Sequence, residues 1–144
     1  MLIDVDHFKQ INDQYGHIAG DRVLQHFTSV LKDCIRDNGI AGRIGGEEFA
    51  VFLPETDGRA AYNIAEELRR RMQRETVPLS ESGESEGGIS CTISIGVAEL
   101  EDSGMSIDAW YHLADTCLYA SKQNGRNRTT YGGQMSHFLL ETQN

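Results

Sequence analysis

Residues 43–53 read Arg43-Ile44-Gly45-Gly46-Glu47-Glu48-Phe49-Ala50-Val51-Phe52-Leu53, and this stretch decides the fold. Two apolar runs, residues 40–44 and 49–53, flank the glycine pair. Paired glycines between apolar runs indicate a hairpin, because tight hairpin turns require positive φ. The second run shows no polar alternation, so it predicts a strand that is covered on both faces. The sequence therefore predicts an antiparallel hairpin with two acidic residues at its tip.

Strand and helix patterns extend on both sides of this hairpin. Residues 2–5 predict a short strand that ends in an acidic, turn-prone segment. Apolar stripes predict helices near 20–38, 58–75 and 106–122. Residues 89–97 alternate as a strand, 129–131 suit a last strand, and the Ser/Glu/Gly-rich residues 80–88 predict an exposed loop. The order β-α-β-β-α-β-α-β predicts an α/β (α+β) sandwich, with helices against a central mixed or antiparallel sheet.

Composition narrows the possible functions. A chain of 144 residues suits one domain, and a formal net charge of −9 argues against a non-specific nucleic-acid binder. The three scattered cysteines form no CxxC pair, which favours small core residues in a reducing compartment. No segment predicts a membrane span or a signal peptide. We therefore expect a cytoplasmic domain, whose parent protein is free to carry a membrane anchor.

Carboxylates recur where the first strand and the hairpin would meet. Asp4 ends the first strand, Asp6 follows two residues on, and Glu47 and Glu48 lie at the hairpin tip. Neighbouring strands lie about 4.8 Å apart, so a hairpin beside the first strand would bring Glu47 near Asp4. The repulsion would be relieved by a hard divalent cation, most plausibly Mg²⁺, with Mn²⁺ as the alternative. Each acid alone suits a solvated turn, but beside two glycines, which let a backbone approach a bulky ligand, the group favours a metal site.

Basic and amide side chains add a second pattern. Lys9 follows the first acids, and Lys122 and Arg126 frame a turn after the last helix, where they would suit a triphosphate. Asn12 and Asp21 would together suit the edge of a guanine base, because an amide both donates and accepts while a carboxylate accepts. Taken singly, these residues are ordinary surface charges, a turn residue and a helix N-terminal acid.

Read in order, these pieces resemble the GGDEF family. The blocks that carry the resemblance are DVDHFK at 4–9, IND at 11–13, Gly16-His17, Gly20-Asp21, RIGGEEF at 43–49, TISIGV at 92–97, Ala114-Asp115, Leu118-Tyr119, Lys122 and Gly125-Arg126-Asn127. The resemblance covers residues 1–131 and implies a palm-like nucleotide cyclase fold for them as a catalytic domain. It also implies that the family's upstream helix and the start of the first strand are missing here. Residues 132–144 form a tail without assignment, and Phe138-Leu139-Leu140 in it suits either a docking patch or a disordered segment.

The resemblance implies a diguanylate cyclase that condenses two GTP into cyclic di-GMP and releases two pyrophosphates. It implies a metal held by Asp4, the Val5 carbonyl and Glu47, with Glu48 in support. Glu47 would help to deprotonate the attacking 3′-hydroxyl, and Lys9 would stabilise charge in the transition state. The remaining substrate contacts that it implies are Asn12, His17 and Asp21 around the guanosine, Lys122 and Arg126 around the phosphates, and Gly45 and Gly46 beside the ligand.

A second GGDEF domain would complete the reaction as a homodimer, and the family implies an upstream sensor or dimerisation domain. Two other interpretations are a non-catalytic module that binds GTP or cyclic di-GMP, and a scaffold that only dimerises. Retention of Asp4, Glu47 and Glu48 argues against the first. The coexistence of the base and phosphate residues argues against the second. Many members also carry an inhibitory Arg-x-x-Asp motif; here Arg36 is in place but Gly39 replaces the aspartate, which predicts weak product inhibition.

Overall fold

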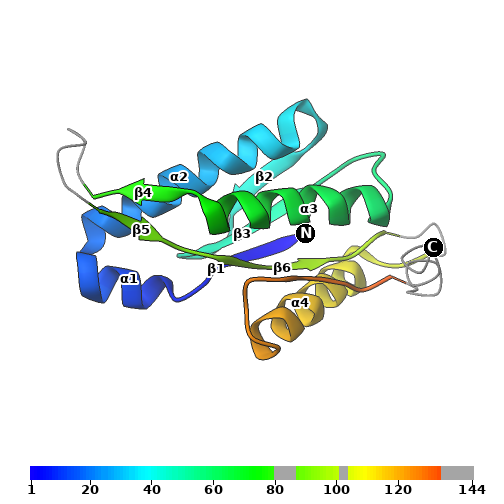
Figure 1. Cartoon of the computed structure of the whole chain (residues 1–144). Helices are drawn as coiled ribbons and strands as arrows, with labels where there is room; N and C mark the ends of the chain where they lie inside the picture. Colours follow the sequence, from blue (N-terminus) through cyan, green and yellow to red (C-terminus); the bar gives the residue numbers. More distant parts are fainter. Residues whose placement is uncertain (80–86, 101–103, 134–144) are drawn as a thin grey trace, which may run out of the picture.

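The computed structural model describes residues 1–79, 87–100 and 104–133 (Figure 1). The loop predicted at 80–88 and the tail from 134 lie largely or wholly outside the described residues. In chain order the elements are β1 (Leu2–Val5), α1 (Phe8–Tyr15), α2 (His17–Ile35), the 3₁₀ turn η1 (Arg36–Asn38), β2 (Ile40–Arg43), β3 (Glu48–Phe52), α3 (Gly58–Arg74), β4 (Thr76–Pro78), β5 (Gly88–Ser90), β6 (Ile93–Val97), α4 (Ile107–Gln123) and β7 (Thr129–Tyr131).

Five strands form one mixed sheet in the order β2-β3-β1-β6-β7. The pairs β2–β3, β3–β1 and β1–β6 are antiparallel, and β6–β7 is parallel. Strands β4 and β5 form a separate two-stranded sheet. Helices α2 and α3 lie on one face of the main sheet and α4 lies on the other (Figure 1). The predicted sandwich around a central mixed sheet is therefore confirmed.

Central strand β1 supplies both faces of the sheet. Side chains alternate across a strand, so Ile3 and Val5 enter the larger core with α2 and α3, while Leu2 packs with Ala114 and Leu118 of α4. Asp4 follows the same alternation as Leu2. All four residues of β1 are buried, because the strand has a partner on each edge. A side chain on this strand is consequently held in a fixed place.

Gly96 lets α4 close on the sheet. A Cβ at this position would lie 2.1 Å from the Ala114 carbonyl oxygen and 2.4 Å from the Leu118 nitrogen, so no larger residue fits. The close approach carries the last turn of α4, with Lys122, toward the end of β1. The packing of α4 on the sheet thus places Lys122 near Asp4.

Four local predictions are wrong. The helix predicted from residue 20 begins at His17, and a separate helix α1 precedes it. The strand predicted at 89–97 is split at Cys91-Thr92 into β5 and β6, which belong to different sheets, and β6 is buried throughout rather than alternating. Strand β3 is covered fully on one face only, because on the other face Ala50 is half-buried and Phe52 is 43% exposed.

The fourth error concerns the reason for the glycine pair. The hairpin is present, but the described glycines with positive φ are Gly16, Gly87, Gly104 and Gly125, so Gly45 and Gly46 do not need that conformation. At Gly45 a Cβ would lie 2.8 Å from Oε2 of Glu48, which is the end of a flexible side chain and could move aside. The glycine lets the Glu48 side chain fold over the turn.

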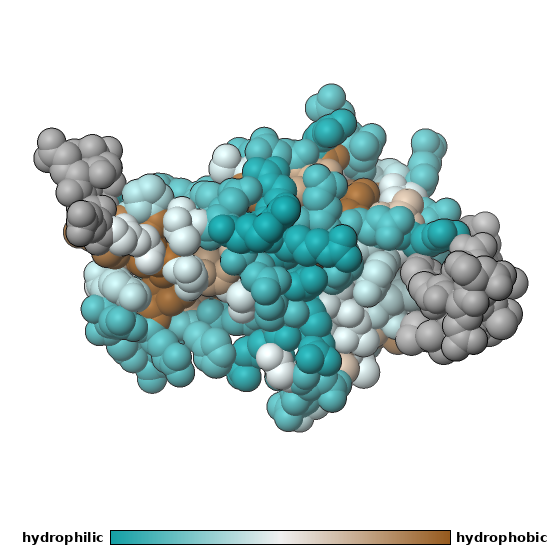
Figure 2. Space-filling view, in the orientation of Figure 1, coloured by the Kyte–Doolittle hydropathy of each residue, from teal (hydrophilic) through white to brown (hydrophobic). Residues whose placement is uncertain are grey.

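The surface fits the composition. Hydrophilic residues cover most of the face seen in Figure 2. Cys91 and Cys117 are buried and Cys34 is half-buried, all three as free thiols, which agrees with core roles. Within the described part of the chain, no helix has the length and apolar character needed to cross a membrane.

Candidate active site

The site begins at Asp4, which is buried at the end of the central strand. Its Oδ2 accepts a hydrogen bond of 2.6 Å from Nζ of Lys122, 118 residues further along the chain. Burial raises the pKa of the Asp4 carboxyl; Lys122 opposes this rise, and the charges of Glu47 and Glu48 add to it. A buried acid with one cation and two further acids nearby is an arrangement that more positive charge would relieve.

The acidic hairpin lies directly beside Asp4, as the sequence predicted. Glu48 is the antiparallel partner of Asp4 in the sheet, and the backbone N–H of Val5 donates to the Glu47 carbonyl oxygen at 3.2 Å. Arg43 braces the turn, because its Nε donates to the carbonyl oxygens of Gly45 and Gly46 at 3.1 and 2.9 Å. The sequence analysis assigned no role to Arg43. The only feature of the sequence that could have suggested one is its position just before the glycine pair.

The donor chemistry fits a divalent cation that the protein alone does not fully enclose. Carboxylate and carbonyl oxygens are the ligands that hard cations prefer. Among the described residues, however, no three acidic, imidazole or thiol groups stand together as a complete metal cluster. Mg²⁺ commonly uses one or two carboxylates and takes its other oxygens from substrate phosphates and water. The arrangement around Asp4 suits that shared mode of binding.

Asn12 carries an unsatisfied polar atom. Its Oδ1 is buried and has no hydrogen-bond partner among the residues that the structure describes. The side chain sits against Gly20 of α2, where a Cβ would lie 1.9 Å from this oxygen. A buried polar atom without a partner costs free energy, so its retention points to a ligand or a water that completes it. The sequence analysis named Asn12 as a site residue, but it took Gly20 only as the start of a helix and as part of the family resemblance.

Asp21 lines a groove between α2 and the β2–β3 hairpin. The groove has a volume of about 690 Å³, and its lining includes Leu24, Thr28, Arg43 and Phe49. This volume is in the range of small-molecule sites. Asn12 and His17 do not line the groove: Asn12 lies in α1, and His17 is an exposed residue that opens α2. Asn12 nevertheless touches Gly20, the residue before Asp21, and His17 opens the same helix, so the three predicted guanosine residues lie along α1 and the start of α2.

One of the three predicted phosphate residues contacts Asp4 directly. Lys122 contacts Asp4, Lys9 is exposed on α1, and Arg126 is exposed in the turn after α4. Asp6 does not share the site with Asp4. Its carboxylate, 2% exposed, accepts from the hydroxyls of Thr92 and Ser94 and from the backbone N–H of Asn127. Asp6 therefore serves as an internal anchor and is not free to bind a metal.

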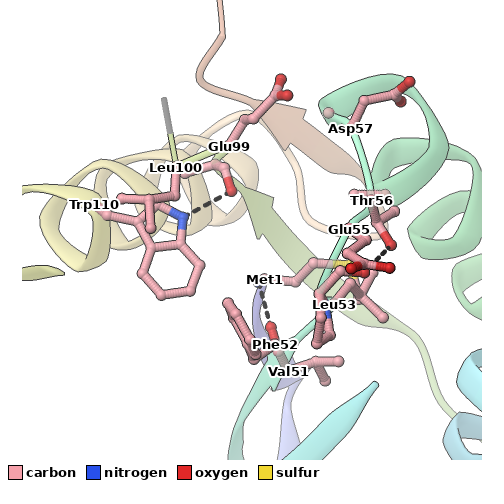
Figure 3. A pocket seen from close by; sticks show the side chains of 14 residues that line it. Met1, Val51, Phe52, Leu53, Glu55, Thr56, Asp57, Glu99, Leu100 and Trp110 are labelled. Carbon is pink, nitrogen blue, oxygen red and sulfur yellow. Dashed lines mark hydrogen bonds between the residues drawn. The ribbon is translucent and has the colours of Figure 1, made fainter. Parts of the chain in front are cut away.

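A second hollow, of about 400 Å³, lies at the opposite end of β1 from Asp4 (Figure 3). Met1, Leu53 and Trp110 help to line it, and Trp110 Nε1 donates to the Ala98 carbonyl oxygen at 2.9 Å. None of its described lining residues belongs to the predicted site. A pocket alone therefore does not identify the site, and the acidic and basic side chains around Asp4 are the better guide.

Comparison with known proteins agrees with this choice. The family model "Diguanylate cyclase, GGDEF domain" matches residues 1–128. The chain is 43% identical over 130 residues to diguanylate cyclase A of Treponema denticola, a match that covers 90% of this chain and 34% of that protein. With diguanylate cyclase VdcA of Vibrio cholerae it shares 41% identity over 128 residues, or 89% of this chain and 37% of that one. The chain therefore spans about a third of the length of these curated relatives.

Solved structures are similar as well. The active GGEEF domain of a diguanylate cyclase from Vibrio cholerae has a TM-score of 0.80 and 37% identity, over 92% of this chain and 81% of that one. The GGDEF domain of DgcB from Caulobacter crescentus, in complex with c-di-GMP, has a TM-score of 0.82 and 36% identity, over 91% and 75%.

The mixed sheet and the acidic hairpin beside a central aspartate define a nucleotide-cyclase-like domain. Within that class the chain belongs to the GGDEF family, and the predicted family and fold are confirmed. Members of this family depend in general on a divalent metal ion.

Proposed function

We propose that this domain is an active diguanylate cyclase that condenses two GTP into cyclic di-GMP and releases two pyrophosphates. The observation that carries the proposal is the acidic hairpin with its Glu48 paired to Asp4, and Asp4 in turn bonded to Lys122. The chain also has the Gly-Gly-Glu-Glu-Phe signature, in the same form that names the active domain from Vibrio cholerae.

In this proposal Asp4, the Val5 carbonyl and Glu47 hold the metal, with Glu48 in support. Mg²⁺ is the preferred ion and Mn²⁺ the alternative. When bound, the ion stabilises negative charge on the attacking and leaving oxygens. Glu47 accepts the proton of the 3′-hydroxyl. Lys122, which bonds Asp4 here, would turn to the phosphates with Lys9 and Arg126, since ammonium and guanidinium groups bind phosphate oxygens strongly.

Base recognition falls to the neighbouring helices. Asn12, with its unsatisfied oxygen, His17 and Asp21 bind the guanosine, and the bare backbone of Gly45 and Gly46 lets the ligand approach. A second copy of the domain supplies the other GTP. Holding the two nucleotides face to face makes each 3′-hydroxyl attack the partner's α-phosphate in an effectively unimolecular step.

Glu47→Gln tests the proposed chemistry in a chain fused to a coiled coil. Glutamine keeps the shape of the side chain and removes the charge, so cyclic di-GMP formation from GTP and Mg²⁺ should fall by about 10²-fold or more. Thermal unfolding should stay nearly unchanged, because Glu47 lies in a turn. Products are identified by mass spectrometry. Turnover near that of the unaltered fusion would refute the role of Glu47, and a lack of product from the unaltered fusion would favour a non-catalytic GTP-binding module.

Base choice gives an independent test. ATP would leave Asp21 and Asn12 without their partners, and sites built on such hydrogen bonds reject the wrong analogue by about 10⁴-fold. We therefore expect GTP to be used and ATP to be poor, and Asp21→Ser to relax this preference, because serine is uncharged and also donates. Comparable use of both nucleotides by the unaltered chain would refute the assignment.

A further inference from the structure

The turn between α4 and β7 has an unusual backbone. The φ angle is +108° at Gly125, +60° at Arg126 and +46° at Asn127. Residues other than glycine rarely adopt this left-handed region, although asparagine tolerates it better than most. Such a turn keeps its shape only where its surroundings hold it in place. Arg126, a proposed phosphate ligand, lies in the middle of it.

Asn127 is held at two points by two different elements. Its backbone N–H donates to Oδ2 of Asp6, just after β1, at 3.0 Å. Its side-chain Oδ1 accepts from Nη1 of Arg69, on α3, at 2.9 Å. The turn is consequently fixed from the end of the central strand and from a helix that is far away in sequence.

Both anchors are themselves fixed. Asp6 is buried and also accepts from Oγ1 of Thr92 and Oγ of Ser94, each at 2.7 Å. Arg69 grips Glu66 with two parallel bonds, Nε to Oε1 at 2.9 Å and Nη2 to Oε2 at 3.0 Å. A two-bond grip of this kind fixes the plane of the guanidinium. The remaining nitrogen, Nη1, then donates to Asn127 and also to Oε1 of Gln73 at 3.1 Å, so its direction is fixed as well.

The turn is also connected to the proposed metal site at Asp4. The backbone N–H of Arg126 donates to the Ser121 carbonyl oxygen at 3.0 Å, and Ser121 Oγ donates to the Ile95 carbonyl oxygen at 2.8 Å. Lys122, the next residue, bonds Asp4. One short stretch of chain thus carries both proposed phosphate cations and is attached to the sheet, to β1 and to α3.

We propose that Asp6, Asn127 and Arg69 form a clamp that positions Arg126 and Lys122 toward the triphosphate of the nucleotide. The three are positioning residues, since they act through the two cations rather than on the substrate. The inference rests on the proposed function, because it takes Arg126 and Lys122 as phosphate ligands. A clamp that only stabilised the fold would affect every nucleotide equally, whereas a positioning clamp must matter more as phosphates are added.

Arg69→Gln tests this, with Arg70→Gln as the matched control. Arg70 is the next residue of the same helix, lies 3.6 Å from the same Glu66 and has a side chain that is 65% exposed. Binding of GMP and of the α,β-methylene analogue of GTP, which cannot release pyrophosphate, is measured by calorimetry with Mg²⁺. We expect Arg69→Gln to weaken binding of the triphosphate by about tenfold and of GMP by less than about twofold, because a misplaced cation loses its contact. Arg70→Gln should resemble the unaltered chain.

The clamp also predicts non-additivity. In an Arg126→Ala chain, Arg69→Gln should weaken triphosphate binding by less than about tenfold, since one of the two cations that the clamp positions is gone and only Lys122 remains. If Arg69→Gln does not fold, Arg69→Lys provides the test of the clamp instead. Lysine keeps the charge beside Glu66 but lacks the fork that reaches Glu66 and Asn127 at once, so it too should weaken the triphosphate selectively.

Equal loss of affinity for GMP and the triphosphate, or no difference between Arg69→Gln and Arg70→Gln, would overturn the clamp while leaving the proposed function intact. Failure of the unaltered chain to bind the triphosphate would instead overturn the proposed function, and the clamp's role with it.

Discussion

Asn12 and Gly20 depend on one another. The buried oxygen of Asn12 occupies the space that a Cβ at Gly20 would need, with a separation of only 1.9 Å. Glycine in a helix costs about 1 kcal/mol relative to alanine, so this position gives up helix stability to make room for the amide. The trade makes sense if Asn12 serves a ligand.

A pair of substitutions tests this coupling. In the unaltered chain Gly20→Ala should destabilise the domain by about 1–3 kcal/mol, because the new methyl group overpacks against Asn12. In an Asn12→Ala chain the same change should be neutral or stabilise by up to about 1 kcal/mol, because most of the clash is gone and the helix gains propensity. Urea unfolding of the four chains gives both values. The same sign in both backgrounds would show that the two residues are not coupled.

Asp4 predicts a pH effect on stability. Burial raises its pKa above the ordinary 3.8, so the folded chain holds this proton more tightly than the unfolded chain does. The contribution of Asp4 to the free energy of unfolding is therefore fully present below 3.8 and is lost as pH rises through the raised pKa. Asp4→Asn has no such loss, and it should become more stable relative to the unaltered chain as pH rises from about 3.5 to 7.

Urea unfolding of both chains across this pH range measures the difference in stability. Cyclic di-GMP synthesis is a separate measurement, and Asp4→Asn should abolish it. The opposite trend, with Asp4→Asn losing relative stability as pH rises, would mean that the bond from Lys122 outweighs burial. In that case Asp4 would be a structural ion pair first and a metal ligand second.

At the scale of elements, the sequence predicted those whose apolar pattern is local. The hairpin, the long stripes of α3 and α4 and the short β1 are where the patterns indicated. Helix α1 was missed because its stripe of Phe8, Ile11 and Tyr15 spans only eight residues, and only Ile11 of the three is fully buried. Strand β4 was missed because three residues carry no readable period, and its partner β5 lies beyond a long connection.

The site was predictable to a similar degree. Pairing of the hairpin with the first strand was enough to predict that Glu47 and Glu48 lie near Asp4. The roles of Asp6 and Arg43 did not, because they depend on contacts from Thr92, Ser94 and the turn's own carbonyls. Single acids in a signature look alike in sequence, and only the tertiary structure separates an anchor from a ligand.

The junction of η1 and β2 bears on feedback. Gly39 is extended there, with φ of −155°, and a Cβ would lie 2.6 Å from Cδ2 of Leu53 and 3.0 Å from the Phe52 carbonyl oxygen. An aspartate does not fit without movement. Gly39→Asp should therefore destabilise the domain by about 1–3 kcal/mol, whereas Gly42→Asp, at a glycine of β2 with nothing within 4 Å, should cost less. Thermal unfolding compares the two.

Because Arg36 lacks its aspartate, we also expect cyclic di-GMP to inhibit the coiled-coil fusion weakly or not at all. Inhibition curves with added product, for the unaltered fusion and for Arg36→Ala, should nearly coincide. Tight inhibition that Arg36→Ala removes would show that the site works without a carboxylate at position 39.

At the scale of the whole molecule, the proposed reaction needs two copies that are both strongly acidic. Each chain has a formal net charge of −9, so two copies repel one another at long range. Salt screens this repulsion over a Debye length of about 10 Å at 0.1 M, so the approach of the two copies should depend on ionic strength. A fused coiled coil replaces that encounter with a high effective concentration.

The chain of 144 residues should accordingly be mostly monomeric and weakly active, with a turnover per domain that rises with protein concentration. At a fixed low protein concentration, raising NaCl from about 20 to 150 mM should increase its turnover, because association becomes easier.

The coiled-coil fusion should be more active and should lose the dependence on protein concentration. It should also respond to salt in the opposite direction, because there only phosphate binding remains for salt to weaken. Turnover is followed by pyrophosphate release, and light scattering gives the oligomeric state. Turnover per domain that stays constant on dilution, in a chain that light scattering shows to be monomeric, would contradict the requirement for two copies.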